Sequence, residues 1–278
     1  SCEENGFLSI DNNEIFIDWV EITDKTVALQ IIWWKALGCA SALAKRLNAS
    51  SVAATWSKLQ EKVQKRILTV CWDQDGTGLW PARHANILAA AWGLSSPNDE
   101  AIARALMDDT VMPSVGTPYM KIFECLALSR LGYSCESINR MCQYWGGMLD
   151  GGATTFWEAY DPNEAHEAAP SFYGRSFGRS MCHAWSAGPC CFIPQAFFQI
   201  RPTNDSWRTW ECCCPSDAIR IEWICLVIPT PHGNIEVELT TNIFSINVPT
   251  GTTMSFDNND YVGPTKVQRP IVRFEDTP

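Results

Sequence analysis

Two kinds of predicted helix alternate along the first part of the chain, and this alternation is the feature that most constrains the fold. Residues 26–46 are apolar on nearly every face, which is typical of a helix buried on all sides. Residues 51–70 instead carry one apolar stripe, at spacings of three or four residues, among lysine, glutamine and glutamate. The two patterns keep alternating and give seven predicted helices in all. The later ones are residues 84–94 (apolar), 96–106 (striped), 117–132 (apolar), 135–145 (striped) and 171–187 (apolar).

Proline marks three of the predicted helix ends. Ser96-Pro97 and Thr117-Pro118 each place a hydroxyl at the N-cap and a proline in the first turn, so each is expected to begin a helix. Pro189 is expected to end the last one.

Inner helices wrapped by outer helices in strict alternation describe an (α/α) toroid built from helical hairpins. In that architecture the loops at one end of the inner ring meet at a central cavity, and functional residues are expected there. The longest such loops are residues 72–84 and 146–171.

The pattern changes near residue 200. From residue 219 on, apolar and polar residues alternate between turn signals such as 229–233, 249–251 and 257–259, which predicts a small antiparallel β-sandwich. We therefore predict a toroid domain over residues 1–200 and a C-terminal β-sandwich domain over residues 201–278.

Composition excludes some partners. The net charge of −10 argues against nucleic acid or an anionic membrane as the main partner. No run of about 18 apolar residues occurs, so no membrane span is expected. The thirteen cysteines include no C-x-x-C pair, so neither a zinc site nor another metal or cofactor is predicted.

The stretch from 145 to 162 has the residue types of a sugar-cleaving site, with four glycines, several aromatics and three acids. Glu158 lies between Trp157 and Tyr160, and a carboxylate among aromatic rings on a glycine-rich loop suits that chemistry. The alternative is a tight turn with a surface acid. Asp18-Trp19 repeats the pairing of carboxylate and indole, where the alternative is a loop anchored by a buried tryptophan.

Six stretches in a fixed order resemble the C-terminal half of bacterial and fungal α-L-rhamnosidases of the six-hairpin toroid type. They are residues 16–19, 85–89, 116–119, 144–158, 183–189 and 229–233. The resemblance implies an inverting glycosidase that removes terminal α-L-rhamnose from a glycoside or oligosaccharide. It carries the general base over onto Glu158 and a sugar-contacting histidine onto His183. Trp19, Asp18 and Trp157 complete the predicted substrate-binding residues.

The chain also departs from that family. The family's general acid belongs to an acidic motif upstream of Asp18 that is absent here, and seven helices fall short of the twelve that six hairpins require. The toroid is therefore expected to be incomplete at its N-terminus, with the rest in a missing N-terminal segment or a second chain. Asp18, Glu21, Asp161 and Glu164 are conceivable substitute acids, and the sequence favours none of them.

Two other functions stay open. One is a non-catalytic carbohydrate-binding remnant that keeps the aromatic pocket. The other is a toroid polysaccharide lyase, with Tyr119, Tyr160 or Tyr173 as base and with Arg175 and Arg179 available to a uronate carboxylate, although the net charge of −10 fits such a substrate poorly.

Overall fold

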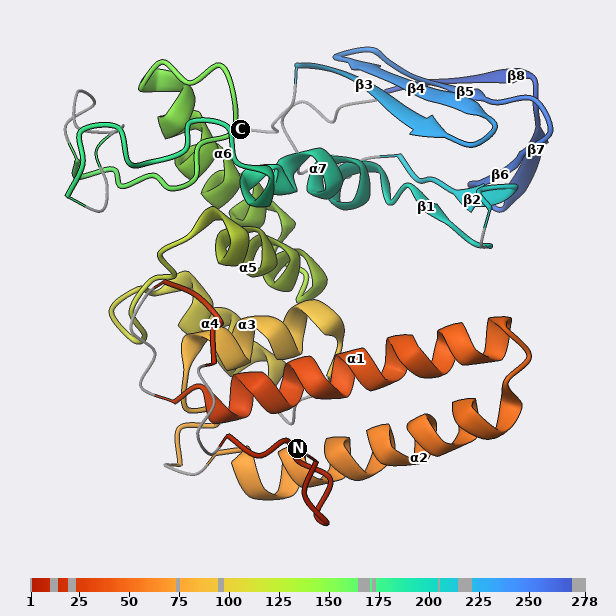
Figure 1. Ribbon diagram of the computed structural model, residues 1–278. Coiled ribbons are helices and arrows are strands. Elements are labelled where there is room, and N and C mark those ends of the chain that lie inside the picture. Colours follow the sequence, from red (N-terminus) through yellow and green to blue (C-terminus); the bar gives the residue numbers. More distant parts are fainter. Residues whose placement is uncertain are drawn as a thin grey trace. The chain divides into compact units, whose positions relative to one another are not determined.

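The computed structural model divides into two compact units, Ser1–Gly188 and Pro189–Pro278. The first unit is helical, whereas strands make up most of the second (Figure 1). The residues described are 2–10, 15–19, 24–73, 76–94, 98–164, 171, 174–204, 206–214 and 222–271.

The described part of the first unit contains six α-helices. They are α1 (Thr26–Arg46), α2 (Ser50–Arg66), α3 (Arg83–Trp92), α4 (Asp99–Met107), α5 (Pro118–Arg130) and α6 (Ser134–Asp150). A π-helical turn, Ile67–Cys71, extends α2, and a short 3-10 helix, Ala184–Ser186, lies near the end of the unit. A seventh helix, α7 (Gly188–Phe198), belongs to the second unit except for its first residue.

The helices of the first unit form an inner and an outer row. α1 packs on α3 and α3 packs on α5, while α2, α4 and α6 each pack against the inner helix that precedes them. Figure 1 shows α1 and α2 side by side as a hairpin. The inner helices are more buried than the outer ones. Eight of the ten residues of the inner helix α3 are buried, whereas only Ala53 and Val63 are buried in the outer helix α2. For the six described helices of the first unit, the predicted alternation of buried and striped helices is confirmed.

Helix α1 differs from the prediction in its second half, where Leu43 is 56% exposed. The inner helix α3, on which α1 packs, is too short to cover all of it. Helix α1 has 21 residues and is about 31 Å long, whereas α3 has 10 residues and is about 15 Å long. By length and composition, α1 alone among the helices of the described segments would suffice to cross a membrane. Its buried residues pack against α2 and α3, as in a core helix.

The predicted helix over residues 171–187 is wrong. Among the described residues of that stretch only Ala184–Ser186 are helical, and α7 begins where the prediction ended. Pro189 lies in the first turn of α7, where a missing backbone N–H costs nothing, instead of ending a helix.

Two other helix boundaries also moved. Helix α6 continues to Asp150, so the first part of the glycine-rich stretch is helical. Helix α4 begins after Asn98, whose side chain accepts a hydrogen bond from the backbone of Ala101 at 3.1 Å. The predicted cap, Ser96-Pro97, lies outside the described residues. The predicted start of α5 is confirmed, with Thr117 as N-cap and Pro118 as its first residue.

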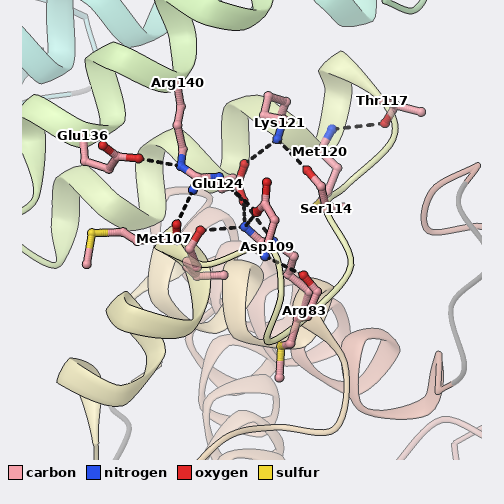
Figure 2. Close-up of polar contacts among 12 residues, drawn as sticks. Arg83, Met107, Asp109, Ser114, Thr117, Met120, Lys121, Glu124, Glu136 and Arg140 are labelled. Atoms are coloured by element: carbon pink, nitrogen blue, oxygen red, sulfur yellow. Dashed lines mark hydrogen bonds and ion pairs between the residues drawn. The ribbon is translucent and has the colours of Figure 1, made fainter. Parts of the chain in front are cut away.

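A buried ionic network joins α3 to α5 (Figure 2). Glu124 of α5 is 0% exposed and accepts a hydrogen bond from Arg83 Nε, at the start of α3, at 3.0 Å. The Arg83 guanidinium also donates to the carbonyls of Leu106 at 2.6 Å and Met112 at 2.9 Å. Arg83 therefore fixes the end of α4 and the following loop as well.

The same network reaches α6. Lys121 Nζ lies 2.8 Å from Glu124 Oε2, and Arg140 of α6 donates to Glu136 at 2.9 Å and to the carbonyl of Met107 at 2.8 Å. Four helices of the first unit thus meet at one charged cluster (Figure 2).

The second unit contains two four-stranded sheets, in the orders β1-β2-β6-β7 and β3-β4-β5-β8. The strands are β1 (Arg201–Pro202), β2 (Thr209–Glu211), β3 (Trp223–Thr230), β4 (Gly233–Thr240), β5 (Ile243–Val248), β6 (Thr253–Phe256), β7 (Asn259–Val262) and β8 (Thr265–Pro270). Pairing is antiparallel except between β2 and β6, which run parallel. Phe244 of β5 and Phe256 of β6 stack with centroids 5.6 Å apart, so aromatic packing joins the sheets.

Local patterns in this unit agree with the sequence. Ile235, Val237 and Leu239 of β4 are buried at alternate positions. Asp257 and Asn258 both have positive φ, as a two-residue hairpin turn between β6 and β7 requires. In the first unit, Cys71 and Cys125 are buried free thiols.

Removing the Glu124 carboxylate should destabilise the first unit. We expect Glu124→Ala to lower the free energy of unfolding by about 3–5 kcal/mol, because Arg83 and Lys121 would stay buried without their shared counter-ion. Urea unfolding followed by far-ultraviolet circular dichroism measures the change. Glu100→Ala, which breaks an exposed pair with Arg104, should cost less than about 1 kcal/mol. Equal losses for the two variants would contradict the role given to the network.

Candidate active site

A buried carboxylate brings the N-terminal ends of the inner helices together. The side chain of Asp18, in the loop before α1, is 0% exposed. Its Oδ2 lies 2.8 Å from Nε2 of His84 in the first turn of α3. Its Oδ1 accepts hydrogen bonds from the Thr117 hydroxyl, at the N-cap of α5, at 2.5 Å and from the backbone of Trp19 at 2.8 Å. We call Asp18, His84 and Thr117 the Asp18 clamp.

The clamp holds its carboxylate in the ionised form. Burial raises the pKa of Asp18, but the hydrogen bonds from His84, Thr117 and Trp19 outweigh it and leave the pKa below its ordinary value. Asp18 is therefore suited to hold the loop in place and is a poor proton donor.

Trp19 extends from the clamp into a cluster of aromatic rings. Its ring lies edge to face with Trp185, with centroids 4.7 Å apart, and is 37% exposed. Tyr119 stacks on Trp185 at 6.1 Å, and the imidazole of His183 lies 4.8 Å from the same indole. Ring faces of this kind bind the apolar faces of sugars.

Glu158 is held beside this cluster by the long loop between α6 and α7. Its backbone N–H donates to the carbonyl of Ser180 at 2.9 Å, and the backbone N–H of Ser180 donates to its Oε2 at 2.6 Å. Trp185 Nε1 donates to the carbonyl of Glu158 at 2.8 Å. Oε1 lies 3.9 Å from His183 Nδ1, which is too far for a hydrogen bond and leaves that oxygen facing a polar neighbour.

The predicted site residues fall into two groups. Glu158, His183 and Trp19 are linked through Trp185. The side chains of Asp18 and Trp157 point elsewhere, Asp18 toward α3 and α5 and buried Trp157 toward Gly151. The roles given to all five in binding or catalysis stay predictions.

His84, Trp185 and the backbone of Ser180 were missed as site residues, and Tyr119 was named only as a possible base of a lyase. A buried histidine in the apolar helix α3 needs a polar partner, and this signal could have identified His84. Trp185 and Tyr119 lay inside stretches already singled out by their motifs. The contact of Ser180 with Glu158 could not be predicted from the sequence, because it is made by backbone groups that almost every residue type has.

Other carboxylates near the site have partners of their own or are exposed. Glu164 pairs with Arg179 at 2.7 Å. Asp161 is exposed and accepts a hydrogen bond from the backbone of Asn163 at 2.9 Å. Glu21 lies outside the described residues. Within the described ranges no group of three histidine, cysteine or acidic side chains is placed to hold a metal ion.

An apolar pocket of about 250 Å³ adjoins the aromatic cluster. Phe16, Ile17, Trp92, Tyr119 and Trp185 are among its lining residues. It shares Tyr119 and Trp185 with the cluster, so a ligand on the rings can extend an apolar group into it.

Comparison with known families gives one match. The model of the bacterial α-L-rhamnosidase six-hairpin glycosidase domain matches residues 9–197. No curated protein matches the chain by sequence.

Solved structures of similar fold include three rhamnosidases. The family 78 glycoside hydrolase rhamnosidase of Bacillus sp. GL1 is 23% identical, with a TM-score of 0.70 over 89% of this chain and 26% of its own. The rhamnosidase of Aspergillus terreus is 14% identical, with a TM-score of 0.73 over 90% and 31%. That of Streptomyces avermitilis, solved in complex with L-rhamnose, is 18% identical, with a TM-score of 0.70 over 92% and 25%. This chain thus spans about a quarter to a third of the length of each.

Breaking the Asp18 clamp should loosen the first unit in a pH-dependent way. We expect Asp18→Ala to lower the free energy of unfolding by about 3 kcal/mol near neutral pH, because His84 and Thr117 lose a charged partner. Because the pKa of Asp18 is lower in the folded protein than in the unfolded chain, its ionised carboxylate stabilises the fold fully at any pH above the unfolded-state pKa of 3.8. This stabilisation is lost as the pH falls through the pKa of Asp18 in the folded protein.

The difference in free energy of unfolding between wild type and Asp18→Ala should therefore be largest above about pH 4 and become smaller at lower pH. Urea unfolding across pH measures it, with the exposed carboxylate variant Glu61→Ala as control. A difference that does not change at acidic pH would contradict the ionised clamp.

Proposed function

The chain belongs to the family of the bacterial α-L-rhamnosidase six-hairpin glycosidase domain, and we propose that its site acts in the hydrolysis of terminal α-L-rhamnose. One observation carries this proposal. Glu158 has one carboxylate oxygen fixed by the backbone of Ser180 and the other facing His183, beside the rings of Trp19 and Trp185.

Glu158 is the general base in this proposal. Oε1 takes a proton from a water molecule while that water attacks the anomeric carbon, and the bond from this carbon to the leaving oxygen breaks with inversion. The hydrogen bond from Ser180 to Oε2 keeps the carboxylate in one orientation. His183, whose side chain is 35% exposed, donates to sugar hydroxyls, and Trp19 presents a ring face to the sugar.

The apolar pocket beside the rings supports a deoxy sugar as ligand. Rhamnose carries a methyl group where most hexoses carry a hydroxymethyl group. The pocket of about 250 Å³ between Phe16 and Trp185 takes a methyl group without leaving a hydroxyl unsatisfied.

The leaving oxygen needs a proton from a second carboxyl group on the other side of the sugar. Asp18 is fully buried with a lowered pKa, and Glu164 is paired with Arg179, so neither suits this task. We propose that the donor comes from a segment outside the described residues. Without a donor, turnover falls by a factor of roughly 10²–10⁴.

The absence of a suitable donor among the described residues also favours a second candidate function, rhamnose binding without turnover. The lyase alternative has less support. Arg179, one of the cations available to a uronate, is paired with Glu164, and Tyr119 packs between Trp185 and Phe123. Tyr173 lies outside the described residues.

Exchange of the candidate base separates these functions. We expect Glu158→Gln to reduce turnover of p-nitrophenyl α-L-rhamnoside by at least about 100-fold, because an amide cannot take the proton from water. The melting temperature should change by no more than a few degrees, because the amide oxygen can still accept from Ser180. Release of p-nitrophenol and a thermal melt provide the readouts, and Glu61→Gln, on the exposed face of α2, is the matched control.

Titration of the wild type with L-rhamnose completes the test. Binding with turnover that Glu158→Gln removes supports hydrolysis, and binding with no turnover in the wild type supports the second candidate. Undiminished turnover in Glu158→Gln would show that Glu158 is not the base. A rise in ultraviolet absorbance on a uronic-acid polymer would favour a lyase.

A further inference from the structure

A second, larger pocket lies in the first unit beside the loop that carries Glu158. Its volume is about 710 Å³, within the range of ligand sites in proteins. We propose that this pocket, here called the Tyr144 pocket, binds a neutral sugar ring next to rhamnose in the same substrate. The inference rests on the proposed function, because it assigns a further part of the substrate.

Two tyrosines give the pocket an aromatic wall. The rings of Tyr144 and Tyr160 lie edge to face, with centroids 5.6 Å apart, and the backbone N–H of Tyr160 donates to the Tyr144 hydroxyl at 3.3 Å. Tyr160 packs so closely on α6 that a Cβ at Gly147 would overlap its ring and hydroxyl. Glycine at 147 therefore sets the position of this wall.

Fixed polar groups from the ionic network also line the pocket. Lys121 and Arg140 line the pocket, and both side chains are about nine-tenths buried. An ammonium group has three N–H donors. Glu124, at 2.8 Å, and the Ser114 hydroxyl, at 3.1 Å, are the described partners of Lys121 Nζ, which leaves one donor for a ligand.

The charges of the pocket favour a neutral ligand. Asp109 and Asp161 line it together with Lys121 and Arg140, so its cations and carboxylates balance. Gln143 adds an amide with both donor and acceptor capacity. Balanced donors and acceptors together with aromatic rings match a pyranose, which has hydroxyl groups around its edge and C–H groups on its faces.

The sequence puts the pocket next to the candidate base. Tyr160 and Asp161 follow Glu158 by two and three residues, so one loop carries the base and continues into the pocket wall. Gly116, which also lines the pocket, directly precedes Thr117 of the Asp18 clamp. This closeness in the chain is our reason for assigning the pocket to the second ring of a disaccharide whose rhamnose lies at Glu158.

Calorimetric titration of the full chain tests this assignment. The probes are L-rhamnose and two disaccharides, rutinose and neohesperidose, which link rhamnose to glucose through different hydroxyls. At least one disaccharide should bind about tenfold more tightly than rhamnose, as expected for one more stacked and hydrogen-bonded ring.

Gln143→Trp fills the pocket from an exposed position on α6 and should remove this gain while leaving rhamnose affinity unchanged. Asn139→Trp makes the same change at an exposed position of α6 outside the pocket lining and should leave both affinities unchanged. Tyr160→Ala, which removes a ring from the wall without adding bulk, should also lose the gain.

The outcomes separate the two proposals. Rhamnose binding with no gain for either disaccharide, or a gain that survives both pocket variants, would overturn the pocket assignment and leave the rhamnose site standing. Disaccharide binding that Gln143→Trp removes, without binding of rhamnose alone, would support the pocket and count against the rhamnose site. Binding of none of the three sugars would overturn both.

Discussion

The candidate site depends on one buried anion. The Asp18 carboxylate is bonded to His84 and Thr117, which lie 66 and 99 residues further along the chain, and so ties the loop before α1 to the starts of α3 and α5. Helix packing alone leaves the loops between helices free to vary. The clamp removes that freedom at the end of the inner row where the aromatic rings gather. A buried charge is tolerated there because hydrogen bonds reach both carboxylate oxygens.

Glu158 is positioned by a different means. It lies on a loop and exchanges two hydrogen bonds with the backbone of Ser180, donating one from its own N–H and accepting one at its carboxylate. A third, from the indole of Trp185 to its carbonyl, also holds it against a later part of that loop. The orientation of the carboxylate thus depends on backbone geometry across 22 residues of chain. Trp185 connects this loop to Trp19 and Tyr119. Trp19 directly follows Asp18, and Tyr119 lies in the first turn of the helix that Thr117 caps. The Glu158 carboxylate and the rings of Trp19, Tyr119 and Trp185 therefore form one assembly.

The alternation of inner and outer helices could be predicted from sequence because burial imposes a period on apolar residues. The cap at Thr117 and the β-strand alternation of Ile235, Val237 and Leu239 were predictable for similar local reasons. Pro189 was misread because proline marks both the end and the first turn of helices, and only tertiary packing decides between them. The partners of Asp18 were not predictable, since nothing local to Asp18 points to His84 or Thr117. The motif around Glu158 identified the residue but carried no information about Ser180.

The long spans closed by the Asp18 clamp have a consequence for the order of folding. The hairpin of α1 and α2 brings together residues close in sequence, so little chain entropy opposes its formation. Contacts across 66 and 99 residues close much larger loops and form late unless other structure has already brought their ends together. The hairpins supply that structure, and Asp18 can find both partners only after α3 and α5 lie side by side. The candidate site is thus among the last parts of the first unit to assemble, and a nascent chain has most of its helices before that site is formed.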